Sequence, residues 1–83
     1  MPWRALWSDT AKKQLKKLPK DHQKRILDKT DQVIINPFHY LERLQGEPVF
    51  RFRVGDYRIV VNIVNQELLI QILKVKKRSR VYD

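Results

Sequence analysis

The clearest structural pattern in the chain is Phe50-Arg51-Phe52-Arg53-Val54-Gly55-Asp56-Tyr57-Arg58-Ile59-Val60-Val61. Apolar and charged residues alternate through most of it, and a period of two is typical of a half-buried β-strand. A Gly-Asp pair between two such runs predicts a two-residue hairpin turn, with glycine first favouring type II′. The segment therefore predicts two antiparallel strands that share one apolar and one cationic face.

The turn also fixes the predicted register. Val54 pairs with Tyr57, so Arg53 lies opposite Arg58 and Arg51 lies opposite Val60. Alternation then sends to the core Phe50, Phe52, Val54, Tyr57, Ile59, Val61 and Ile63. The opposite face carries Arg51, Arg53 and Arg58, and we call it the arginine face. A second turn at Asn65-Gln66 is expected to pair Val64 with Glu67. This register places Leu68, Ile70 and Ile72 in the core and Gln71 on the arginine face.

Upstream of the hairpin, the pattern predicts a short strand over residues 2–7 and two helices. Ser8 or Asp9 caps the first helix, and Pro19 ends it or opens the next one. Its buried stripe is expected to be Ala11, Leu15 and Leu18. The second helix runs from about Asp21 to Ile35 and is stopped by Asn36-Pro37. Its apolar face is expected to be Ile26, Leu27, Thr30, Val33 and Ile34.

The rest of the chain completes the predicted fold. Residues 37–47 are expected to be a loop, residues 57–64 and 67–75 to be strands, and residues 76–83 to be a basic tail. The fold class is therefore α+β: a short N-terminal strand, a helical hairpin, then an antiparallel β-meander with the helices packed on one sheet face. We expect one domain over residues 1–83, because the chain is short and has no repeats or linker.

The charge balance indicates a polyanionic partner. The chain has 18 lysine and arginine residues against 9 acidic residues, a formal net charge of +9. Such a balance is typical of proteins that bind nucleic acid, an anionic membrane or an acidic protein. The sequence has no cysteine, which excludes disulfides and thiolate zinc sites, and its acidic residues are scattered, so we expect no metal or other cofactor.

The sequence also predicts where the protein acts. No signal peptide is recognisable at the N-terminus, and no apolar run is long enough to span a bilayer. The absence of cysteine fits a reducing compartment. We therefore expect a cytoplasmic protein without a membrane partner.

The arginine face is the first candidate site. Like charges directly opposite one another destabilise a sheet, so Arg53 facing Arg58 is the kind of local conflict expected at functional positions. For one arginine, a stem that covers the sheet and keeps the protein soluble is the simpler interpretation. Three arginines on one face favour an anion site, because the planar guanidinium fork suits phosphate.

The C-terminal tail is the second candidate. It gathers Lys74, Lys76, Lys77, Arg78 and Arg80, with Tyr82 close behind. A basic tail alone indicates only solvated charge or a nonspecific nucleic-acid patch. A tyrosine beside it can stack on a base of single-stranded RNA. We therefore assign to RNA binding Lys74, Lys76, Lys77 and Arg80.

The chain resembles the RelE/ParE toxin superfamily, and within it the RelE-type messenger RNA interferases. The resemblance lies in the order of elements and in Leu44-Gln45-Gly46, Phe50 to Val60 and Val75 to Tyr82, and it covers nearly the whole chain. It implies a toxin held by a cognate antitoxin protein. It also implies that the toxin enters the ribosomal A site and cleaves messenger RNA through the 2′-hydroxyl. The positions that correspond to the RelE-type catalytic set are Arg51, Arg53, Arg58, Arg78 and Tyr82.

This set suits a metal-independent endoribonuclease, with one departure from RelE. Arg58 and Arg78 are fixed cations that can stabilise the charge developing on the phosphorane. RelE has lysines at the positions of Arg51 and Arg53, and one of them is its candidate base. Arginine is effectively never deprotonated, so neither residue is a convincing general base here.

Three interpretations of the missing base stay open. Tyr82 takes the role, or catalysis rests on orientation and charge alone, or activity is weak. His22 and His39 are the ordinary neutral-pH bases, but the register places both away from the arginine face, and we expect them to be surface residues.

Two other function classes are compatible with the sequence. One is a ParE-like inhibitor of DNA gyrase, which shares the fold without cleaving RNA. The other is a non-catalytic RNA- or ribosome-binding module. ParE-like relatives commonly lack the full set of arginines and tyrosine, which favours the ribonuclease. For all three classes we expect the antitoxin to bind by strand addition or through a helix on the helical hairpin.

Overall fold

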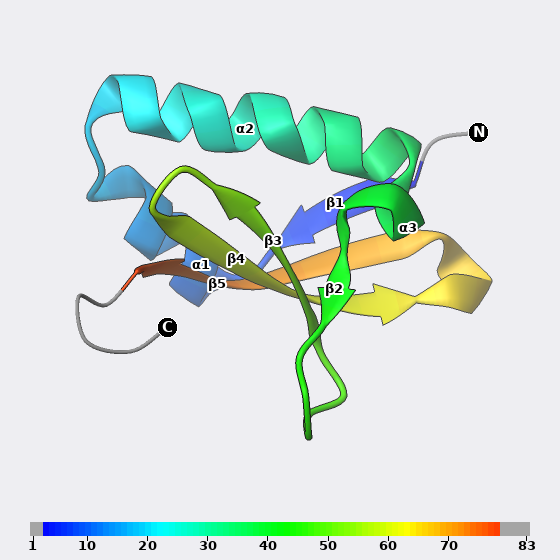
Figure 1. The fold of residues 1–83 in the computed structure, drawn as a ribbon. Helices are drawn as coiled ribbons and strands as arrows, with labels where there is room; N and C mark the ends of the chain where they lie inside the picture. Colours follow the sequence, from blue (N-terminus) through cyan, green and yellow to red (C-terminus); the bar gives the residue numbers. More distant parts are fainter. Residues whose placement is uncertain (1–2, 79–83) are drawn as a thin grey trace.

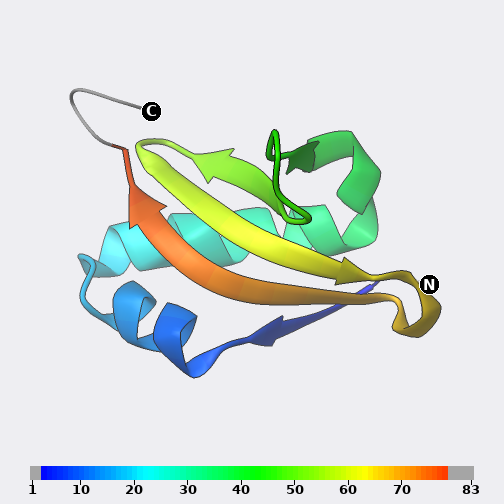
Figure 2. The ribbon, with the colours of Figure 1, turned by 90° about the horizontal axis from the view of Figure 1, so that it is seen from below.

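The protein's structure, a computed structural model, describes residues 3–78. Five strands form one sheet in the order β1-β5-β4-β3-β2, and the helices pack on one face of it (Figure 1). The elements are β1 (Arg4–Trp7), α1 (Asp9–Lys16), α2 (Lys20–Ile35), α3 (Pro37–Tyr40), β2 (Glu42–Arg43), β3 (Phe50–Val54), β4 (Tyr57–Val64) and β5 (Leu69–Lys77). This arrangement confirms the α+β fold, and Figure 2, seen from below, looks onto the sheet with α2 behind it.

The two main helices begin where the sequence predicts. Ser8 caps α1, since its Oγ accepts a hydrogen bond from the Ala11 N–H at 3.0 Å and donates one to the Leu73 carbonyl at 2.9 Å. The cap therefore fixes α1 beside β5. In α2, which follows Pro19, the fully buried residues Ile26 and Val33 form the inner side. Leu27 is 43% exposed, so its predicted place on the buried face is wrong.

The region predicted as a loop contains two short elements, which corrects the prediction for residues 37–47. Pro37 opens α3, a position where its missing N–H costs nothing. β2 then pairs with β3, with Glu42 opposite Arg51. Two residues are too few to produce a visible alternation, so this strand had no signal in the sequence.

The central hairpin has the predicted register. Val54 pairs with Tyr57, Arg53 with Arg58 and Phe52 with Ile59. Gly55 has a φ of +57°, and a positive φ at the first turn position alone is what a type II′ turn requires. The core residues Phe52, Ile59 and Val61 are at most 1% exposed. The predicted division into an apolar and a cationic face is therefore confirmed for this hairpin.

The second turn differs from its prediction. Residues Asn65–Glu67 form a 3-10 turn and Leu68 is left-handed, with a φ of +51°. Val64 therefore pairs with Leu69 instead of Glu67, and Leu68 is 43% exposed instead of buried. The shift is two residues, so the strand keeps its faces, with Ile70 and Ile72 in the core and Gln71 opposite Asn62.

A β-bulge at Leu73 then reverses the alternation of β5. Val61 pairs with Ile72 and Val60 pairs with Lys74, which leaves Leu73 as the extra residue. After the bulge, Val75 points into the core. Lys74 and Lys76 come to lie on the arginine face, whereas regular alternation from Gln71 would have turned both toward the helices.

Candidate functional site

Three cations lie side by side on the arginine face, next to the Gly55-Asp56 turn. Arg53 on β3 is opposite Arg58 on β4, which is opposite Lys76 on β5. Directly opposed residues have Cβ atoms roughly 4.5–5.5 Å apart, so their charges repel in the free protein. A bound anion would relieve that repulsion, and we call these three residues the cation row.

A second row, two residues further along the strands, carries Arg51 and Lys74 with Val60 between them. Arg51 is more enclosed than Arg53, since its side chain is 20% exposed, and its Nε lies 3.7 Å from Glu42 Oε1. This contact is an ion pair too long to be a hydrogen bond. Among residues 3–78 the buried Nε has no hydrogen-bond partner. The Arg51 Nε is therefore a buried, unsatisfied donor, while Glu42 partly neutralises the charge of the guanidinium.

Arg78 joins the same end of the face. Its backbone N–H donates to the Asp56 carbonyl at 2.6 Å, which holds the end of β5 against the turn. A hollow of about 20 Å³ there is lined by Arg53, Gly55, Asp56, Tyr57, Arg58 and Arg78. It has room for one water-sized group, so a ligand lies on this surface and is not enclosed by it. The predicted site residues Arg80 and Tyr82 lie outside the described residues.

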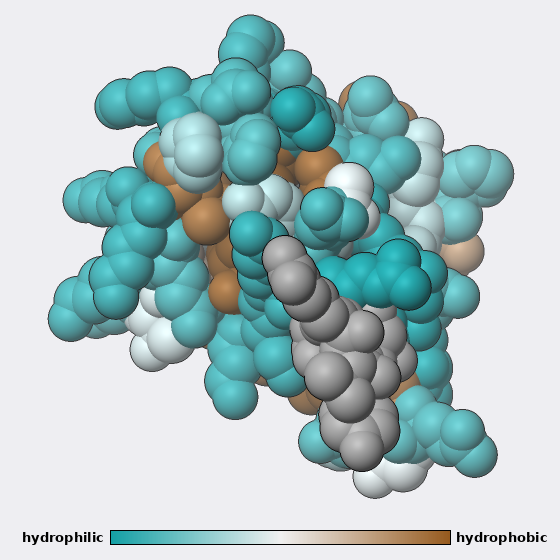
Figure 3. Space-filling model, turned by 60° about the vertical axis from the view of Figure 1, so that its left-hand side comes forward, coloured by the Kyte–Doolittle hydropathy of each residue, from teal (hydrophilic) through white to brown (hydrophobic). Residues whose placement is uncertain are grey.

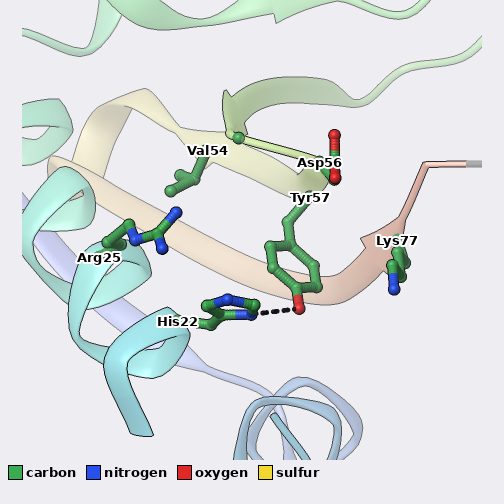
Figure 4. Close-up of a pocket in the computed structure, with 7 residues that line it drawn as sticks. His22, Arg25, Val54, Asp56, Tyr57 and Lys77 are labelled. Carbon is green, nitrogen blue, oxygen red and sulfur yellow. Dashed lines mark hydrogen bonds between the residues drawn. The ribbon is translucent and has the colours of Figure 1, made fainter. Parts of the chain in front are cut away.

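A larger cavity lies on the opposite side of the turn. It measures about 170 Å³, and we call it the His22 pocket; it is lined by His22, Arg25, Val54, Gly55, Asp56, Tyr57 and Lys77 (Figure 4). His22 Nδ1 and the Tyr57 hydroxyl are hydrogen-bonded at 2.9 Å. Lys77 pairs with Tyr57 across the strands, so it lies on this side and not with Lys76.

This pocket was not predicted from the sequence. His22 was expected to be a surface residue, but its side chain is only 34% exposed because it packs against Tyr57. It does lie away from the arginine face, as predicted. His39 is exposed and stacks edge-on against the neighbouring Tyr40. The contact between His22 and Tyr57 joins residues 35 positions apart, and no local pattern signals such a contact.

The sequence of the chain matches a family model described as the ParE toxin of the type II toxin-antitoxin system, parDE, over residues 5–82. The chain belongs to this family. It is a toxin of a type II toxin-antitoxin system, in the RelE/ParE superfamily.

Several solved structures that this toxin resembles contain RelE toxins. The RelBE2 toxin-antitoxin complex from Mycobacterium tuberculosis matches with a TM-score of 0.87 and 25% identity, over 94% of this chain and 100% of the other. The archaeal RelE-RelB complex from Pyrococcus horikoshii matches with a TM-score of 0.82 and 31% identity, over 96% and 99%. The intact E. coli RelBE complex matches with a TM-score of 0.79 at 19% identity, over 94% and 99%, which shows the shared fold. A comparison with curated protein sequences finds no match.

The toxin's remaining surface is mainly polar on the side that carries the end of β5. Figure 3 shows hydrophilic side chains over most of this view, with small apolar areas between them. Within residues 3–78, no group of three or more His, Cys, Asp or Glu side chains is placed to hold a metal ion. None of the helices in the described part is long and apolar enough to cross a membrane.

Proposed function

We propose that this toxin is a ribosome-dependent endoribonuclease that cleaves messenger RNA in the A site. The observation that carries the proposal is the cation row, Arg53, Arg58 and Lys76 on three adjacent strands, flanked by Arg78. Opposed like charges cost stability in the free protein. An RNA backbone carries the negative charge that complements such a row.

The proposed reaction is an attack within the RNA. The 2′-oxygen attacks the adjacent phosphorus, the bond from phosphorus to the 5′-oxygen breaks, and a cyclic phosphate remains. The proton of the 2′-hydroxyl passes to a base, and the departing 5′-oxygen takes up a proton. Arg58 and Arg78 stabilise the charge that builds up on the phosphorane. Tyr82 is the proposed proton-transfer group, because Arg51 and Arg53 stay protonated.

Other cations of the arginine face have a binding role in this proposal. Arg53, Lys74 and Lys76 are exposed and hold the RNA backbone, while Arg51, whose Nε is buried, adds positive charge to the face. We extend the RNA-binding assignment to Arg80. Lys77 lines the His22 pocket, and its proposed contact with RNA is made there.

The openness of the face supports dependence on the ribosome. The hollow beside Arg58 holds only one water-sized group, so the toxin alone neither encloses the RNA nor excludes water. Cleavage requires the 2′-oxygen, the phosphorus and the 5′-oxygen to be in line, and holding reactants in that geometry supplies much of a rate enhancement. We infer that the ribosome provides the second wall, so the toxin acts in the cytoplasm.

The expected protein partner is a cognate antitoxin. The solved structures described above include complexes with RelB antitoxins, and this toxin's net charge of +9 favours an acidic partner. We propose that the antitoxin masks Arg51, Arg53, Arg58 or Arg78, or displaces the C-terminal tail.

Gyrase inhibition is the second candidate, favoured by the description of the matching family model. The experiment that separates the two is induction of the toxin in cells with pulse labelling of protein and DNA. The ribonuclease proposal expects protein synthesis to stop first, with replication continuing for some time. Replication that stops first, with protein synthesis intact, would reject it in favour of gyrase.

A further inference from the structure

The Gly55-Asp56 turn has a cationic cavity on each side. Gly55, Asp56 and Tyr57 line both the hollow of the arginine face and the His22 pocket. A polyanion that crosses the cation row and continues past the turn therefore reaches the pocket. This continuity gives the pocket a direct relation to the proposed RNA site.

The size of the pocket suits a phosphate group. Its volume is about 170 Å³, many times the roughly 10–15 Å³ that one water requires. It opens on one side to solvent and is formed by α2, the turn and the end of β5 (Figure 4). A phosphate with its ester oxygens fits into this space while the rest of the chain remains outside.

The lining carries the donors that a phosphate needs. Arg25 and Lys77 are cations on either side of the His22–Tyr57 pair (Figure 4). A Cβ atom at Gly55 would lie 3.9 Å from Arg25 Nη1, so the guanidinium reaches the turn itself. The hydrogen bond between Tyr57 and His22 fixes the imidazole at the back of the pocket. Arginine and lysine around a polar wall are typical of phosphate recognition.

Two carboxylates near the pocket, those of Asp21 and Asp56, compete only weakly with a phosphate for its cations. Arg25 lies 3.6 Å from Asp21, but both side chains are more than 60% exposed, and an exposed ion pair of this kind contributes little. The one carboxylate in the lining, Asp56, belongs to the turn at the outer edge of the pocket. With Arg25 and Lys77, the pocket lining therefore has more positive than negative charge.

We propose that the His22 pocket binds a backbone phosphate of the RNA, outside the phosphodiester that is cleaved. This inference rests on the proposed RNA substrate and adds a second contact to it. Arg25 and Lys77 are the binding residues, and His22 and Tyr57 position the wall between them. The pocket would thus fix the direction in which the RNA leaves the arginine face.

The test measures binding without cleavage. The probe is a short single-stranded RNA with a 2′-O-methyl group at every position, so that it cannot be cleaved, labelled for fluorescence anisotropy and titrated at several salt concentrations. The variants are Arg25→Gln, Lys77→Gln and the double variant. Lys24→Gln is the matched control, because it removes one cation and one i,i+4 ion pair from the same helix, as Arg25→Gln does. Circular dichroism checks that all variants fold.

The double variant is expected to bind about tenfold more weakly, as loss of a charge-assisted contact predicts. Its plot of log affinity against log salt should be shallower by about 0.7, the contribution of one phosphate in a single strand. Lys24→Gln should keep the slope of the wild type. A double variant with the wild-type slope and affinity would overturn the proposal.

Two further measurements separate the possible failures. Titration of the ¹⁵N-labelled protein with inorganic phosphate should shift the amide signals of His22 and Val54, which line the pocket and not the hollow of the arginine face, in the wild type and not in the double variant. Failure of the RNA proposal itself would appear as wild-type protein that does not bind the probe. Unchanged RNA binding, together with an acidic peptide that shifts these amides and loses affinity in the double variant, would overturn the RNA assignment and give the pocket to a protein carboxylate.

Discussion

Arg53 and Arg58 occupy directly opposed positions on β3 and β4, with Lys76 opposite Arg58 on the other side. The sheet thus holds three cations in one row, where cross-strand pairing normally favours opposite charges. This arrangement lowers stability and at the same time creates a strip of positive charge on an open face. Local features that lower stability are expected at functional sites, and a strip of positive charge suits the binding of a polyanion.

Replacing one member of the row should therefore stabilise the protein. For Arg53→Thr we expect the free energy of unfolding to rise by roughly 0.2–1 kcal/mol, because an opposed like charge is removed. Urea unfolding at low salt measures the gain, and high salt should reduce it by screening. Arg43→Thr is the control, since Arg43 is opposite Phe50 and meets no cation there. An equal gain in both variants would contradict the account.

The pair formed by Glu42 and Arg51 makes a prediction about RNA affinity. Glu42 is 64% exposed and 3.7 Å from Arg51 Nε, so its carboxylate competes with RNA for that cation. For Glu42→Gln we expect roughly twofold tighter binding of single-stranded RNA at low salt, the size of an exposed ion pair. Glu47→Gln, in the exposed loop before β3, is the control. If both variants gain equally, the effect is net charge and not release of Arg51.

The hydrogen bond between Tyr57 and His22 should contribute measurably to stability. Tyr57 is 8% exposed, and Tyr57→Phe leaves His22 Nδ1 half-buried without its partner. We expect a loss of about 0.5–1.5 kcal/mol in the free energy of unfolding. Tyr40→Phe, which keeps the ring beneath Lys29, should change it less. Equal effects of the two substitutions would show that the contact with His22 adds nothing.

Leu68 has a backbone conformation that leucine rarely adopts. Its φ is +51° and its side chain is 43% exposed, and a left-handed conformation costs a non-glycine residue about 1–2 kcal/mol. Leu68→Gly and Leu68→Asn should therefore raise the midpoint of thermal unfolding. Leu68→Ala keeps the penalty and should not. Stabilisation by alanine as large as that by glycine would mean that backbone strain is not the cause.

Local pattern and turn chemistry explain what the sequence could predict. The alternation around Gly55-Asp56 sets the register of β3 and β4, and with it the position of Arg51, Arg53 and Arg58. Ser8 is one of the two helix caps that the sequence predicts, and the structure shows that it is the one used. In each case residues close in sequence decide the geometry, so reading outward from the turn recovers the hairpin.

Contacts between distant residues explain what the sequence could not predict. The bulge at Leu73 brings Lys74 and Lys76 onto the arginine face, and the Ser8 Oγ bond to the Leu73 carbonyl joins residues 65 positions apart. The His22 pocket also depends on packing of α2 against the end of the sheet. None of these three features produces a periodic pattern in the sequence.

Cleavage of messenger RNA on programmed ribosomes by purified toxin tests whether the cation row takes part in catalysis. Wild type is compared with Arg58→Ala, which removes the middle cation of the row, and with Arg43→Ala as a control for net charge. The account predicts that wild type and Arg43→Ala cut the message in the A site, while Arg58→Ala is slower by about 10²–10³-fold. Wild-type toxin that leaves the message intact, while its induction still arrests growth, would contradict the claim and make the arginine face a binding surface only.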